Sequence, residues 1–173
     1  MSRIDEAVIN FQVFEGGTNY FGMSEATLPE VNYLVQEISG AGISGNMESI
    51  ILGHVEAMTL VLNFRTVTRD AIALLEPREH ELELRVAQQH KLSERARSEV
   101  IGLKHVFVAK PKSFKPGSLA PMTPADASGE YAIYYWKMSI AGRRTLEIDI
   151  RNMIYFINGR DYLDEVRAVL GRR

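Results

Sequence analysis

The stretch between Glu130 and Gly171 constrains the fold most, because strand and turn signals follow one another in it without interruption. Residues 131–140 are dense in aromatic and β-branched side chains, which favour strands. Ala141-Gly142 then supplies a tight turn, and apolar residues at 146, 148 and 150 alternate with charged ones. The stretch therefore predicts an antiparallel hairpin.

The two strands of this hairpin differ in their pattern. The first carries apolar side chains on both faces, including Trp136, which predicts a strand packed between two layers. The second has one apolar face, with Ile148 and Ile150, and one polar face, with Glu147 and Asp149. We expect Trp136, Ile148 and Ile150 in the core. Glu147 is expected in solvent, in a ladder of ion pairs.

A turn and a short helix are expected after the hairpin. Asn158-Gly159 is a strong turn signal. Asp161 is a candidate N-cap, a single apolar stripe follows it, and Gly171 closes the helix. A helix this short is marginal alone, so it must dock on the rest of the chain.

The chain before residue 130 reads mainly as strands. Val8–Phe14 is a strand, a Gly-Gly turn follows, and residues 19–22 begin the next strand. Met58–Phe64 alternates as a half-buried strand does. The expected internal helix runs from Thr68 to Glu76, where Pro77 stops it. The fold class predicted is thus mainly β with two short helices.

A long hairpin and a long loop occupy the middle of the chain. Residues 81–86 alternate between apolar and polar, and the apolar face then gives out towards Lys91. The polar segment 93–99 connects, and residues 100–110 return antiparallel. Residues 110–129 hold four of the six prolines and three lysines, which predicts a stiff irregular loop. A loop of that length is usually functional or part of an interface.

Composition narrows the function. The 173 residues are 46% hydrophobic and 24% charged, as expected for one globular domain spanning 1–173. The chain has no cysteine, so a disulfide framework and thiol chemistry are excluded. A net charge of −2 disfavours a dedicated nucleic-acid binder. With no signal-peptide or membrane-spanning pattern, we expect a soluble, cytoplasmic product without membrane anchoring.

No pattern of catalytic, metal-binding or cofactor-binding residues stands out. The four histidines lack the spacing that places two ligands on one face. The glycine-rich segment 40–46 is followed by no Lys-Ser/Thr pair, so it predicts a hairpin tip and not a phosphate loop. We therefore expect no enzyme, no metal site and no cofactor.

The order of these motifs resembles a known family. The run YYWKMSIAGRRTLEID, then INGRDYL and the terminal LG, is similar to the C-terminal signature of the major tail tube proteins of contractile injection systems, which include contractile phage tails and R-type bacteriocins. The resemblance extends upstream through Thr27–Pro29, Gly40–Gly42, Met58–Phe64 and Lys110–Gly117. The stretch from Leu119 to Ser128 departs from it and looks like an insertion.

The resemblance implies a single tail tube domain: an antiparallel β-sandwich or barrel with a short internal helix, a C-terminal helix and long hairpins that join an oligomeric inner barrel. It implies homohexameric rings stacked into a tube, a surrounding sheath protein, and baseplate and terminator proteins at the ends. DNA or a tape-measure protein would occupy the lumen. Assembly would occur in the bacterial cytoplasm, and the product would be a virion tail or an extracellular tail-like particle. Phage, bacteriocin and type VI secretion tubes remain open.

Two sets of residues follow from this expectation. The expected lumen-facing residues are Glu81, Glu83, Arg85, Gln89 and Lys91. The inter-ring contact is expected in the loop 40–52, at Gly40, Gly42, Ile43, Gly45, Met47 and Ile50. The alternative is a monomeric β-barrel or sandwich module that binds a ligand or a protein, and it would require a concave apolar pocket.

Overall fold

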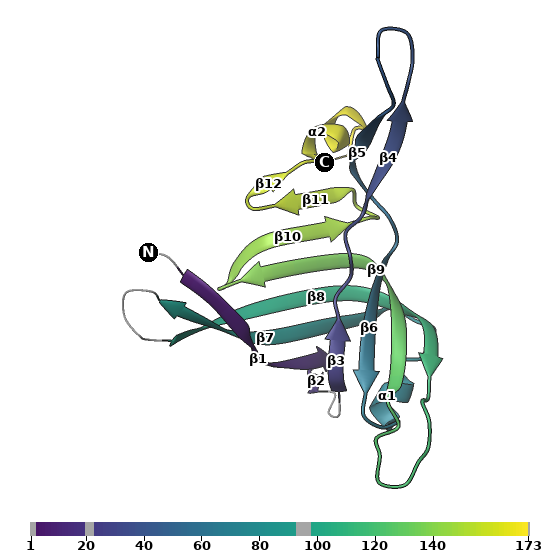
Figure 1. Cartoon of the computed structure of the whole chain (residues 1–173), viewed down its shortest axis with the longest axis vertical. Coiled ribbons are helices and arrows are strands. Elements are labelled where there is room, and N and C mark those ends of the chain that lie inside the picture. The colour runs from purple at the N-terminus through teal and green to yellow at the C-terminus, as the bar shows by residue number, and fades with distance from the viewer. Residues whose placement is uncertain (1–2, 20–22, 93–97, 173) are drawn as a thin grey trace.

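The computed structural model describes residues 3–19, 23–92 and 98–172. Ten strands form one sheet in the order β12-β11-β10-β9-β8-β7-β1-β2, with β6 beside β9 and β3 beside β6, and β4 and β5 form a separate sheet (Figure 1). The strands are β1 (Arg3–Glu15), β2 (Thr18–Asn19), β3 (Met23–Thr27), β4 (Tyr33–Ile38), β5 (Met47–Val55), β6 (Met58–Phe64), β7 (His80–Leu92), β8 (Ser98–Lys115), β9 (Ala127–Ile140), β10 (Arg143–Asp149), β11 (Ile154–Ile157) and β12 (Arg160–Asp161). The helices are α1 (Arg69–Ala73) and α2 (Asp164–Val169). A mainly β, antiparallel fold with two short helices is confirmed.

The large sheet is organised around β9, which changes partners along its length. Residues 127–133 pair with β6, residues 135–140 pair with β10, and β8 runs along the other side of both halves. The register against β8 shifts between Tyr135 and Ile133, so Tyr134 is bulged. A bulge bends a strand, and this one lies where the partner changes.

The core lies under β6 and the adjoining part of β9. Every second residue of β6, from Met58 to Phe64, is buried, as the alternation predicted. Trp136 and Ile148 belong to the same apolar cluster. Trp136 stacks on Phe107 and donates its indole N–H to Nδ1 of His105 at 3.3 Å. Burial lowers the pKa of His105, which keeps the ring neutral and its Nδ1 able to accept.

Two predictions about the C-terminal hairpin are wrong. Ile150 is 48% exposed and not in the core. The strand β10 ends at Asp149, whose Oδ1 accepts the backbone N–H groups of Arg151 and Asn152, so Ile150 lies in a turn. Glu147 is buried, because Arg144 pairs with it and the hydroxyl of Tyr135 donates to it at 2.9 Å. The alternation in β10 predicted the face on which Glu147 lies, but it did not predict that Tyr135 and Arg144 cover the carboxylate.

The boundaries of two other elements also differ from expectation. The irregular loop covers only residues 116–126, since β8 runs on to Lys115 and β9 starts at Ala127. Pro111 is accommodated in β8 at a second register shift, where a missing N–H costs least. The helix α1 is capped by Thr68 as predicted, with its Oγ1 accepting from the Ala71 N–H at 3.2 Å, but it ends at Ala73 and not at Glu76. Of the expected strand at 19–22, residues 20–22 lie outside the described residues, as do residues 93–97 of the connector.

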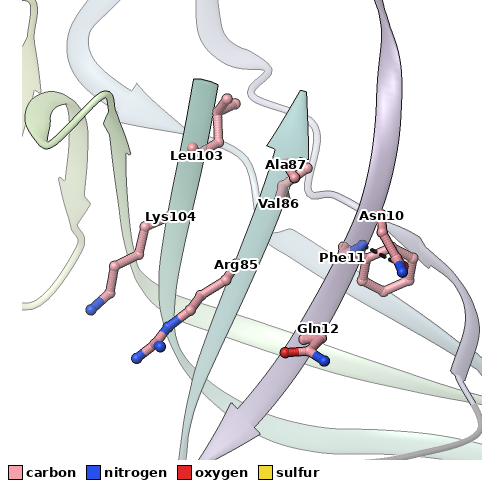
Figure 2. Close-up of a pocket in the computed structure, with 9 residues that line it drawn as sticks. Asn10, Phe11, Gln12, Arg85, Val86, Ala87, Leu103 and Lys104 are labelled. Atoms are coloured by element: carbon pink, nitrogen blue, oxygen red, sulfur yellow. Dashed lines mark hydrogen bonds between the residues drawn. The ribbon is translucent and has the colours of Figure 1, made fainter. Parts of the chain in front are cut away.

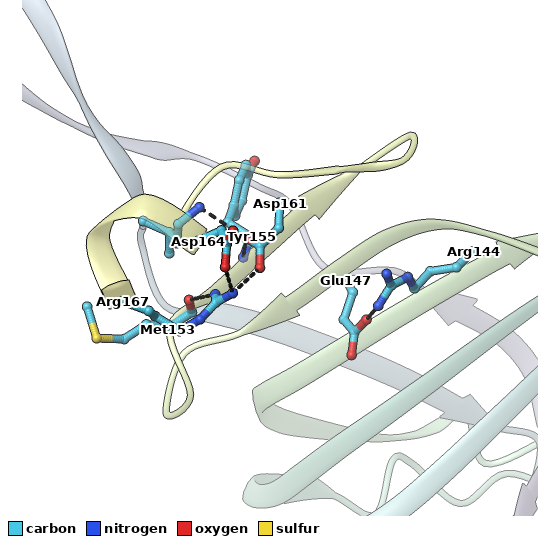
Figure 3. A network of polar contacts seen from close by, with 8 residues as sticks. Arg144, Glu147, Met153, Tyr155, Asp161, Asp164 and Arg167 are labelled. Atoms are coloured by element: carbon cyan, nitrogen blue, oxygen red, sulfur yellow. Dashed lines mark hydrogen bonds and ion pairs between the residues drawn. The ribbon is translucent and has the colours of Figure 1, made fainter. Parts of the chain in front are cut away.

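The Asp161 side chain does not cap α2 but fastens the segment before it (Figure 3). The N-cap position is Leu163, and Oδ1 of Asp161 accepts the backbone N–H groups of Leu163 and Tyr155. Its other oxygen binds Arg167 at 2.6 Å, and Arg167 also donates to the Met153 carbonyl. Burial alone would raise the pKa of Asp161, but these hydrogen bonds outweigh it and lower the pKa.

Candidate assembly surfaces

The hairpin of β4 and β5, which we call the arm (residues 33–55), projects beyond the large sheet at one end of the molecule's longest axis (Figure 1). No residue of either strand is fully buried. Nine of its large apolar side chains are exposed: Tyr33, Leu34, Val35, Ile38, Ile43, Met47, Ile50, Ile51 and Leu52. A soluble monomer rarely exposes so many contiguous apolar residues, so the arm has the character of an interface.

The base of the arm is fixed to the C-terminal segment. The hydroxyl of Tyr155 donates to that of Tyr33 at 2.7 Å, and the two rings meet edge to face. Gly53 has φ +68° and lies against Leu163, so close that a Cβ at Gly53 would stand 2.5 Å from that side chain. The register of β4 against β5 shifts here, so β5 bulges. Sequence reasoning missed this anchor, because it depends on a contact between distant segments.

The predicted inter-ring residues all lie in the arm. Gly40, Gly42, Ile43 and Gly45 fall in the turn between β4 and β5, and Met47 and Ile50 lie on β5. All of them are exposed. The structure therefore brings these residues together at the free end of the arm, where another molecule can reach them.

The predicted lumen residues share one face of β7, since positions 81, 83, 85, 89 and 91 are all odd in a strand without register shifts against β8. Glu83 binds Lys104 at 2.8 Å and Arg85 on the same face. The hydrogen bond from Lys104 is the main cause of the lowered pKa of Glu83. Gln89 donates to Glu6 at 2.6 Å.

Neighbouring strands extend this polar face in rows. Glu83 lies opposite Val106, Val106 opposite Lys137, and Lys137 opposite Glu147. Arg151 closes one side, paired with Glu79 and stacked on Tyr134. We call this surface the polar face. It consists of residues 81, 83, 85, 89 and 91 of β7 with Lys104, Val106, Lys137, Glu147 and Arg151. The sequence pattern of β7 alone could not reveal the residues that β8, β9 and β10 add to it, because that requires the register.

A hollow of about 440 Å³ lies over β1, β7 and β8 beside the polar face (Figure 2). It exists because Ala87 and Gly102 are opposite each other and have little side chain to fill the space. The cations at its margin, Arg85 and Lys104, are both paired with Glu83. Asn10 and Gln12 also line the hollow, and the Asn10 side-chain oxygen accepts the backbone N–H of Phe11 at 2.8 Å.

Two strand edges have no neighbouring strand along part of their length, one on each side of the hairpin of β7 and β8. Among the described strands, β2 pairs with β1 only at Phe14 and Glu15. The outer edge of β1 from Arg3 to Val13 therefore has no neighbouring strand there. The pairing of β8 with β9 starts only at Leu103, so the beginning of β8 extends beyond the end of β9. Exposed edges of this length are templates for pairing with another chain.

The part of the chain that the structure describes holds no cluster of three or more metal-ligating side chains. Neither α1 nor α2 has the length and apolar content that a bilayer-crossing helix requires. The arm, the polar face and the two strand edges are features of the described chain that are open to contact with other molecules.

Comparisons with known proteins identify a family and a similar fold. The model of the family described as "Phage tail tube protein FII" matches residues 5–171. A search of curated proteins found no significant match. Among solved structures, the chain is similar in fold to the sheath/tube terminator of PVC, an extracellular contractile injection system, in its extended state. That match has 14% identity and a TM-score of 0.53, and it covers 79% of this chain and 97% of the other.

Proposed function

Because the chain belongs to the phage tail tube protein FII family, we propose that it is the structural subunit of the inner tube of a contractile tail, assembled as stacked hexameric rings. The observation that carries the proposal is the arm, with nine exposed apolar side chains on a hairpin that has no partner sheet within the described chain. Such a surface needs a second molecule to cover it.

Ring closure is supported by the two strand edges. The outer edge of β1 and the beginning of β8 lie on opposite sides of β7. A contact between two different edges is heterologous, and such contacts generate rings when the rotation between copies closes. Pairing β1 of one copy with β8 of the next would extend the sheet around the ring and cover both of these edges. Six copies per ring is the number that the family resemblance implies.

The arm would join one ring to the next, and the polar face would line the bore. Glu81, Glu83 and Lys104 give that face both signs of charge. A bore of mixed sign neither holds a polyanion tightly nor repels it strongly, which suits passage of DNA or of a tape-measure protein. The role is mechanical and uses no catalysis.

The remaining partners follow from the same proposal. A sheath would surround the tube and drive it through a target envelope on contraction, with baseplate and terminator proteins at the two ends. The helices α1 and α2 are the elements we assign to the sheath, because Ile72 on α1 and Val169 and Leu170 at the end of α2 are exposed. The subunits would assemble in the bacterial cytoplasm into a virion tail or a tail-like particle.

Electron microscopy of the purified protein tests the proposal directly. We expect hexameric rings or stacked tubes in negative stain, and two-dimensional averages with sixfold symmetry. A monodisperse monomer at high concentration, with no rings in any field, would contradict the proposal and favour the monomeric binding module. Rings of another symmetry would retain the tube role and correct the copy number.

A further inference from the structure

The loop at residues 116–126 is the most unusual exposed feature outside the arm. Leu119 and Met122 at its tip are fully exposed. Two bare, large apolar side chains on one loop are unexpected unless something covers them. Residues 119–126 of this loop lie within the stretch that departs from the family pattern, so the resemblance assigns the tip no role.

The loop is held in a defined shape. At its base, the Ser118 N–H donates to the Ala125 carbonyl at 2.9 Å, and the Ala125 N–H donates to the Arg65 carbonyl at 2.8 Å. Gly117 is required there, since a Cβ would stand 1.8 Å from the Ala125 oxygen. Within the tip, Thr123 Oγ1 donates to the Ala120 carbonyl at 3.0 Å. A shaped loop loses little entropy on binding.

Met122 adds evidence of constraint. Its φ is +61°, a left-handed conformation that costs a non-glycine residue about 1 kcal/mol or more. The side chain gains nothing within the subunit in return, because it is fully exposed. Strain combined with exposure indicates a side chain that is presented to a partner.

The position and charge of the loop identify that partner. The loop and the free end of the arm lie at opposite ends of the longest axis (Figure 1). The arm carries Glu37 and Glu48 and no Lys or Arg, whereas the base of the loop carries Lys112, Lys115 and Arg65 against Asp126. Stacked rings require two different complementary surfaces at the two ends of each subunit.

We propose that the loop 116–126 receives the arm of a second copy of this chain in the next ring, with Leu119 and Met122 against the apolar side chains of the arm. The inference rests on the proposed tube function and names the surface that the arm meets. The lysines at the base of the loop would draw in the acidic arm, and the apolar contact would hold it.

A double substitution tests the proposal. We expect Leu119→Ser with Met122→Ser to leave the subunit folded, with an unchanged melting temperature and rings of unchanged diameter, while tubes shorten to single rings or short stacks. Val169→Ser is the matched control, since it removes an equally bare apolar side chain from α2, and its tubes should keep wild-type length. Full-length tubes from the double variant would overturn the inference. This conclusion would hold even if those tubes failed to recruit a sheath.

Disulfide trapping gives a second readout, because the chain contains no cysteine. Met122→Cys and Ile43→Cys subunits, mixed before assembly and oxidised, should give a mixed dimer on a non-reducing gel. Met122→Cys mixed with Val169→Cys should give none. Wild-type tubes without the first crosslink would defeat this inference and leave the tube function standing, whereas a wild-type protein that forms no rings would defeat the tube function itself.

Discussion

The strands β5 and β6 follow one another in the chain, separated only by Glu56 and Ala57, yet they differ in the burial of their side chains. Both are rich in large apolar residues. In β6 every second side chain is buried, whereas β5 has none that is fully buried. The difference lies in the neighbours: β6 pairs with β3 and β9 over the core, and β5 pairs only with β4. Apolar content therefore does not report burial within one subunit, and in the function we propose a second molecule covers the arm.

The strongest test of the core side of this comparison is Trp136→Ala. The indole is enclosed by Phe107 and His105 and donates a hydrogen bond to the latter. We expect a loss of about 3–5 kcal/mol from the cavity and the broken packing, with poor solubility. Chemical denaturation would measure it, and a wild-type tryptophan emission spectrum typical of water exposure would contradict the placement.

Two methionines make the comparison within one residue type. Met58 of β6 is 1% exposed and Met47 of β5 is 51% exposed. We expect Met58→Ala to cost about 2–5 kcal/mol and Met47→Ala to change the free energy of unfolding by less than about 0.5 kcal/mol. The order reverses for assembly, where Met47→Ala should weaken ring stacking. Equal unfolding midpoints for the two variants would show that the arm packs on its own subunit.

Glu147→Ala sharpens the boundary between core and surface. The carboxylate is covered by Tyr135, whose pKa burial and this hydrogen bond raise to about 12, and by Arg144, which also stacks on Phe156. We expect a loss of about 1–3 kcal/mol, because the substitution leaves a half-buried hydroxyl without its acceptor. Thermal unfolding alongside Glu81→Ala, on the exposed part of the polar face, provides the control. If Glu147→Ala lost no more stability than Glu81→Ala, Glu147 would be exposed to solvent, as the sequence predicted.

Acid should loosen the anchor of the arm before it unfolds the core. The pKa of Asp161 is lowered in the folded chain, so its contribution to stability is present above its unfolded value and is lost as pH falls below about 4. Protonation releases Arg167 and the backbone N–H of Leu163, the residue that packs on Gly53. Limited pepsin cleavage in α2 at pH 3 would detect this. Asp161→Asn should show the looser anchor already at neutral pH. If this substitution left the susceptibility of α2 to proteolysis unchanged, the mechanism would be ruled out.

The sequence was informative where a local rule decides the outcome. The alternation of Met58–Phe64, the Thr68 cap and the turns at Ala141-Gly142 and Asn158-Gly159 need only neighbouring residues, and all appear as predicted. The burial of Glu147 and the anchor at Gly53 depend on side chains from other segments, which no local pattern contains. The prediction for Ile150 failed for a local reason, because Asp149 accepts the backbone N–H groups of Arg151 and Asn152 and ends the strand one residue earlier.

The change of partner along β9 has a consequence for how the chain folds. The strands β7 to β11 are joined in sequence, so each can pair with the one before it across a connection that is short to close. The pairing of β6 with the first half of β9 instead joins segments far apart in the chain, for example Met58 with Ile133. We expect the strands β7 to β11 to pair early and β6 to dock last. Pulsed hydrogen exchange should then find the amides of β8 protected before those of β6. Until β6 docks, the first half of β9 is an open edge in a chain that we propose polymerises. The rate of that last step then sets how long a newly made subunit is exposed to premature association.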